Sequence, residues 1–84
     1  MKNTNNKINK NQLFIYSVFS DINPEIENFC QKNNITYSTE DYRTVEFISS
    51  KTNLRKLHNK FFNEYEFEIY TQEEFNNLYN QDFN

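Results

Sequence analysis

Hydrophobic and polar positions along the chain form several patterned stretches that follow a polar start. Residues 13–19, LFIYSVF, make an apolar and aromatic run that is typical of a β-strand. Residues 42–49 and 64–70 alternate between apolar and polar side chains, with Val45 and Phe47 set against Thr44 and Glu46 in the first of them. This period of two predicts strands with one buried and one exposed face. Residues 35–38, ITYS, predict a shorter strand.

Apolar residues at helical spacing predict helices between and after these strands. In residues 20–34, Asn23 can cap a helix and Pro24 suits its first position. A second helix is expected at about residues 51–62, with Ser50 or Thr52 as its cap. The apolar stripes of these two helices are Ile22, Ile26, Phe29 and Cys30, and then Leu54, Leu57 and Phe61.

A third helix is predicted for residues 71–80. Thr71 and Glu74 have the spacing of a capping box, in which the two residues bond to each other's backbone. Phe75, Leu78 and Tyr79 make its apolar stripe.

The order of these elements is strand, helix, strand, strand, helix, strand, followed by an extra C-terminal helix. This order predicts an α+β fold of the ferredoxin-like βαββαβ type. Two helices would cover one face of a four-stranded antiparallel sheet whose first and third strands are central. We expect one domain over residues 12–84, preceded by a disordered basic tail at residues 1–11 that is rich in Asn and Lys.

The chain has no glycine, so turns that need a positive φ must use Asn or Asp. We expect them at Asn33-Asn34, Asn63 and Asp41. Glycine-dependent phosphate-binding loops are excluded. The shortage of residues with GC-rich codons points to an AT-rich genome, such as that of a bacterium, a phage or mobile element, a eukaryote or a virus.

Two stretches carry short motifs of aliphatic and aromatic residues. Leu13-Phe14-Ile15-Tyr16-Ser17-Val18 begins with an aliphatic, an aromatic and an aliphatic residue, and in this it resembles the first-strand motif of the RNA-recognition domain. Arg43-Thr44-Val45-Glu46-Phe47-Ile48 resembles its third-strand motif, with Val45 at a position that usually holds an aromatic residue. The resemblance implies a sheet face that stacks on RNA bases.

The strand alternation favours a different register. If Phe47 faced RNA, Glu46 would point into the core, at a desolvation cost of several kcal/mol. With Phe47 inside, the open face instead carries the carboxylates of Glu46, Glu66 and Glu68, which repel phosphates. Phe14 and Tyr16 would then pack under the C-terminal helix rather than bind RNA.

Charge is distributed unevenly along the chain, although the net charge is only −3. Residues 61–84 carry six acidic residues and no basic residue. Aromatic anchors within a polar rim are typical of protein-binding surfaces.

The candidate protein contacts are therefore Tyr16, Glu46, Glu66, Glu68 and Tyr70. A basic stretch on the second helix gives the candidate nucleic-acid contacts Lys51, Arg55, Lys56 and Lys60.

Enzymatic chemistry is not expected from this sequence. Cys30 and His58 are the only cysteine and histidine, and Cys30 falls on an apolar stripe, where cysteine behaves as a small hydrophobic residue. We expect no catalytic residue, metal site or cofactor. Residues 2–11 lack the apolar run of a signal peptide, and no run has membrane-spanning length, so a cytoplasmic, non-membrane protein is expected.

Three functional hypotheses remain open. The first is a small non-enzymatic module that binds a protein with a basic surface. Its most concrete form is a phage or mobile-element inhibitor of a nucleic-acid-handling enzyme, because anti-CRISPR proteins and other anti-defence proteins are similar in size and charge. The second is nucleic-acid binding through the basic helix or an RNA-recognition-like sheet. The third is a structural subunit or a homodimer that pairs through edge strands.

Overall fold

The computed structural model describes residues 12–41 and 44–81. Its elements in chain order are β1 (Phe14–Phe19), α1 (Pro24–Lys32), β2 (Thr36–Asp41), β3 (Thr44–Ser49), α2 (Lys51–Phe61) and α3 (Gln72–Gln81). The predicted basic tail at residues 1–11 lies outside the described residues, as do Tyr42 and Arg43, the first residue of the second motif. The chain is therefore a small α+β protein, with three strands and three helices in its described part.

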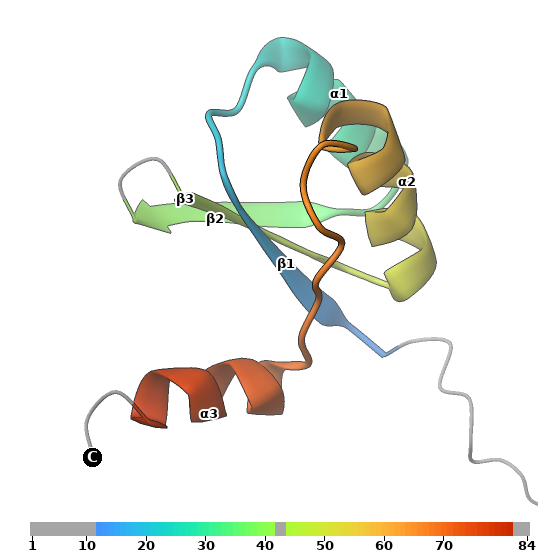
Figure 1. Cartoon of the computed structure of the whole chain (residues 1–84). Coiled ribbons are helices and arrows are strands. Elements are labelled where there is room, and N and C mark those ends of the chain that lie inside the picture. Colours follow the sequence, from blue (N-terminus) through green and yellow to red (C-terminus); the bar gives the residue numbers. More distant parts are fainter. Residues whose placement is uncertain (1–11, 42–43, 82–84) are drawn as a thin grey trace, which may run out of the picture.

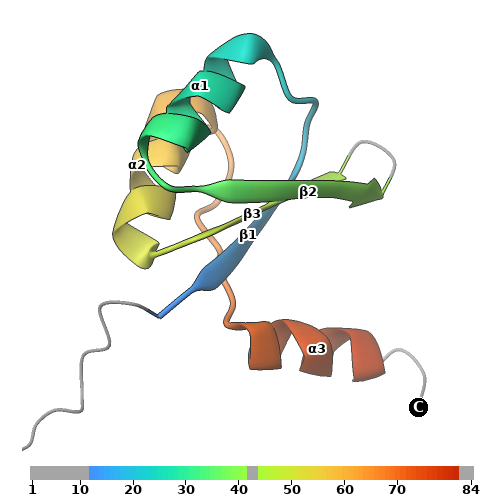
Figure 2. The ribbon, with the colours of Figure 1, turned by 180° about the vertical axis from the view of Figure 1, so that it is seen from behind.

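The strands form one antiparallel sheet in the order β1-β3-β2. Helices α1 and α2 lie side by side on one face of this sheet, as predicted (Figure 1). Helix α3 lies apart from them, beyond the start of β1, in both views of the ribbon (Figures 1 and 2). It packs mainly on β1, and most of its described side chains are exposed.

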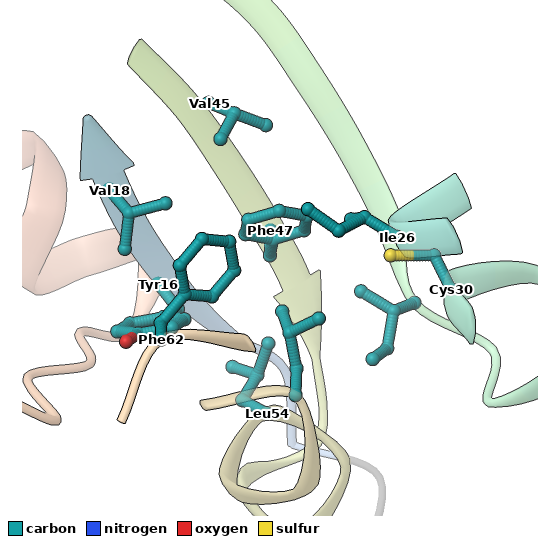
Figure 3. Close-up of a cluster of buried hydrophobic side chains, with 10 residues drawn as sticks. Tyr16, Val18, Ile26, Cys30, Val45, Phe47, Leu54 and Phe62 are labelled. Atoms are coloured by element: carbon teal, nitrogen blue, oxygen red, sulfur yellow. The ribbon is translucent and has the colours of Figure 1, made fainter. Parts of the chain in front are cut away.

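The alternation in β3 correctly predicts which residues are buried. Val45 and Phe47 are fully buried, while Glu46 between them is on the opposite face and half-buried. They pack with α1 and α2 residues in a core whose members are shown in part in Figure 3: Tyr16, Val18, Ile26, Cys30, Ile35, Val45, Phe47, Leu54, Leu57 and Phe62.

Local capping signals place the starts of the helices. The Asn23 side chain accepts a 2.8 Å hydrogen bond from the backbone N–H of Ile26. The Ser50 hydroxyl accepts a 3.3 Å hydrogen bond from the backbone N–H of Asn53. Thr71 and Glu74 exchange bonds of 2.9 and 3.1 Å as a capping box. Within the α3 stripe, Phe75 is half-buried and Leu78 is exposed, and the side chain of Tyr79 lies outside the described part of the chain.

The only positive φ among the described residues is 56°, at Asn34. This confirms the prediction for Asn33-Asn34, where the chain turns from α1 into β2. The predictions for Asn63 and Asp41 are wrong, because neither residue has a positive φ.

The predicted fourth strand at residues 64–70 is not seen, so a ferredoxin-like arrangement is not confirmed. The segment runs beside the outer edge of β1, but it forms only an isolated antiparallel bridge, between Tyr70 and Ile15. The physical reason is a tight turn, in which the backbone N–H of Glu68 donates to the carbonyl of Glu66 at 3.1 Å. This turn takes the Glu68 amide away from β1. As a result β3 is central, as predicted, whereas β1, which was also predicted to be central, is an edge strand of the three-stranded sheet.

Candidate functional site

Tyr16, a predicted protein contact, is buried in the core and exposes only 1% of its surface. Its ring packs against those of Phe47, Phe62 and Phe67, and its hydroxyl forms a 2.8 Å hydrogen bond with Nδ1 of His58. Burial, and to a smaller extent the charge of Tyr65, raise the pKa of Tyr16 to about 12. Tyr16 therefore faces α2, not the open face of the sheet and not α3, and it cannot contact a partner in this conformation.

His58 and Phe62 are buried members of this cluster that the sequence did not single out. His58 lies on α2, is 8% exposed, and contacts the Phe67 ring at a centroid distance of 5.1 Å. Burial, followed by the nearby Arg55 charge, lowers the pKa of His58. The neutral imidazole is therefore the form that suits this site.

Residues 64–81, which we call the acidic arm, comprise the extended segment after α2 and helix α3. Within the segment, Glu64, Glu66 and Glu68 are exposed, whereas the Phe67 ring between them points inward and is half-buried. The carboxylates lie on the outside of the arm, as predicted, but Tyr65, which the alternation predicts on the inner face with Phe67, is also exposed. Glu73 and Glu74 extend the exposed acidic surface into the first turn of α3.

Aromatic side chains attach the arm to the rest of the molecule. The hydroxyl of Tyr65 donates to the carbonyl of Phe19 at 3.1 Å, and this ring is still 43% exposed. Tyr70 exchanges two backbone hydrogen bonds with Ile15, of 2.6 and 3.0 Å, and its half-buried ring packs against that of Phe75.

Glu46, the remaining predicted contact, is on a different part of the molecule. It lies in the middle of the open sheet face, with Ser17 of β1 and Ser38 of β2 as its cross-strand neighbours. Strand β1 separates it from the arm. The structure thus brings Glu66, Glu68 and Tyr70 together on one segment but leaves Glu46 on the sheet.

The four predicted nucleic-acid contacts are all exposed on α2: Lys51, Arg55, Lys56 and Lys60. Arg55 also takes part in attaching the arm, because its guanidinium carbon lies 4.2 Å from the centre of the Phe67 ring. Such a cation–π contact is attractive. The basic surface of α2 and the acidic arm therefore meet at Phe67.

Cys30 lies in the core with 1% exposure, and burial raises the pKa of its thiol to about 11. That direction disfavours the reactive thiolate. The hydrogen-bond partner of His58 is Tyr16. No group of three His, Cys, Asp or Glu side chains in residues 12–41 and 44–81 could hold a metal ion.

No helix in the described part of the chain is long and apolar enough to span a membrane. Comparisons with protein-family models, curated proteins and solved structures find no match to the chain.

Proposed function

We propose that the chain is a small protein-binding module that docks a partner with a basic surface onto its acidic arm. The observation that carries this proposal is the alternation in the arm, which keeps Glu64, Glu66 and Glu68 exposed while Phe67 anchors the backbone between them. The carboxylates are thus presented by a segment that is attached at a few points, not by a flexible tail.

Electrostatics supports a basic partner. Residues 61–84 contain no basic residue that could neutralise the glutamates within the arm. Complementary charge across an interface mainly speeds association and selects the partner. Tyr65 and Tyr70 supply partly exposed rings beside the carboxylates, and aromatic residues are enriched among the energetically important contacts of interfaces.

The concrete form of this proposal is an inhibitor of a nucleic-acid-handling enzyme, encoded by a phage or a mobile element. Enzymes that bind nucleic acid carry basic surfaces, which an acidic protein can occupy. The codon bias toward AT-rich residues supports such a source.

Nucleic-acid binding through α2 is the alternative, and the exposure of Lys51, Arg55, Lys56 and Lys60 on one helix favours it. Against it, Arg55 is engaged with Phe67, and the two neighbours of Phe67 in the chain are glutamates. Their negative charges weaken the field that phosphates would meet at this end of the basic surface.

A charge-reversal experiment tests the proposal. The double variant Glu66→Lys/Glu68→Lys is used to capture proteins from a cell lysate alongside the wild-type chain. We expect it to lose a basic protein that the wild type retains at low salt. The matched control, Asp21→Lys/Glu25→Lys, makes the same change of charge at exposed positions outside the arm and should retain that protein. Equal capture by both variants would contradict a role for the arm.

A further inference from the structure

We propose that two copies of the chain exchange their acidic arms, so that the arm of each copy packs against β1 and α2 of the other. The first observation is the incomplete pairing between the arm and β1. The arm runs antiparallel to β1, with Tyr65 in contact with Phe19 and Tyr70 in contact with Ile15. The two backbone hydrogen bonds between the arm and β1 nevertheless both involve Ile15. This proposal does not depend on the proposed function.

The outer edge of β1 offers more pairing than the arm uses. Alternate residues of a strand direct their backbone groups toward the same neighbour, so Ser17 and Phe19 face the arm as Ile15 does. In a continued antiparallel register Glu68 would pair with Ser17. The tight turn from Glu66 to Glu68 prevents this in the closed chain.

A short connection explains why the turn is present. Only residues 63–66 separate Phe62, which caps the C-terminus of α2 and lies in the core, from the inserted ring of Phe67. Within this connection the N–H of Tyr65 bonds to the carbonyl of Phe62, which makes a second tight turn. Short hinges that must double back favour exchange between copies, because the hinge can straighten when its arm crosses to a partner.

The site that receives the Phe67 ring indicates which molecule pairs with the outer edge of β1, namely a second copy of the chain. Tyr16, His58 and Arg55 surround this ring with centroid or guanidinium distances of 5.5, 5.1 and 4.2 Å. The glutamates on either side of Phe67 complement the basic surface of α2. A second copy supplies the same ring, the same flanking charges and the same partner for Ile15, so exchange keeps the contacts of Phe67 and Tyr70 with β1 and α2.

Exchange would also account for the strand pattern of residues 64–70. A straightened arm gives up the Tyr65–Phe62 and Glu68–Glu66 turn bonds and gains ladder bonds opposite Ser17 and Phe19 of the other copy. Each half of the dimer would then contain the fourth strand that the alternation of Tyr65, Phe67 and Ile69 indicates.

Cysteine cross-linking tests the exchange directly in the full chain. Ile15→Cys and Tyr70→Cys are made separately, mixed, unfolded together, refolded and oxidised. Exchange predicts a covalent heterodimer, because residues 15 and 70 pair between copies. Native Cys30 does not compete, since it is buried and burial raises the pKa of its thiol. Each variant refolded alone is the control and should give no comparable covalent dimer.

Hinge length provides a second test that leaves the arm contacts untouched. Inserting Gly-Ser-Gly after Asn63 lets the arm close on its own chain, so we expect dimerisation to weaken about tenfold or more, as measured by light scattering over a range of concentrations. A wild-type chain that stays monomeric at every concentration overturns the proposal. A dimer that ignores hinge length and forms no link between residues 15 and 70 also overturns it, and indicates association through another surface.

Discussion

The ring of Phe67 joins three parts of the molecule, because it touches Tyr16 of β1 and both His58 and Arg55 of α2. It is only half-buried, whereas Phe47 in the centre of β3 is fully buried. The stability that each ring provides should follow this difference in burial.

Alanine substitutions measure that difference. Phe47→Ala should lower the free energy of unfolding by about 3–5 kcal/mol, and Phe67→Ala by about half as much, because less apolar surface is lost. Glu68→Ala, at the exposed position next to Phe67, should stay within about 0.5 kcal/mol of the wild type. Urea denaturation gives all three values. Equal losses for Phe67→Ala and Glu68→Ala would mean that the arm does not pack as described.

The burial of His58, together with the nearby charge of Arg55, makes stability depend on pH. Because the folded state lowers the pKa of His58, the unfolded chain binds a proton more readily than the folded chain. The free energy of unfolding should therefore fall as the pH drops below about 6.5, the ordinary pKa of histidine, and level off below the folded pKa. Urea midpoints at about pH 7.5 and about pH 5.5 measure the effect.

His58→Gln serves as the control for this titration, since glutamine does not ionise. Its stability should change much less over the same pH range. A stability of the wild-type chain that rises toward acid pH would contradict the lowered pKa.

At the scale of the elements, Asn34 closes α1 by adopting a φ of 56°. For a residue that has a Cβ atom but no polar side chain to hydrogen-bond locally, this left-handed conformation is unfavourable by about 1–2 kcal/mol. Asn34→Ala should therefore destabilise the protein by about 1 kcal/mol, and Asn34→Gly should not. Asn28→Ala, at an exposed site within α1, is the matched control and should be neutral or slightly stabilising. Thermal denaturation compares the three, and a neutral Asn34→Ala would argue against the left-handed turn.

The helices could be predicted from the sequence because their signals are local. Asn23, Ser50 and the pair Thr71–Glu74 each cap the helix that follows them within three residues. The clean alternation of β3 likewise predicted its buried face.

Two features could not be predicted because they depend on distant contacts. In β1 both Ile15 and Tyr16 are buried, so alternation could not assign a face to Tyr16. In residues 64–70 the alternation correctly placed the glutamates outside and Phe67 inside, but Tyr65 is 43% exposed, and the tight turn between Glu66 and Glu68 interrupts pairing with β1. The exposed positions of Glu66 and Glu68 were therefore predicted, whereas the core position of Tyr16 and the separation of Glu46 from the arm were not.

At the scale of the whole molecule, charge is divided between two neighbouring surfaces. Helix α2 presents four exposed basic residues, and the acidic arm beside it presents exposed glutamates. The proposed function assigns binding to the acidic surface, and the alternative assigns it to the basic one. The two assignments predict opposite responses to charged ligands.

The most direct measurement is an amide NMR titration of the full chain with two probes, a short arginine-rich peptide and a short single-stranded RNA, at low and at moderate salt. If the acidic arm is the binding surface, the peptide should shift the amide signals of residues 64–74 in a salt-dependent way, and the RNA should leave the spectrum unchanged. Shifts at Lys51, Arg55, Lys56 and Lys60 on adding RNA, with no response of the arm to the peptide, would contradict the proposed function.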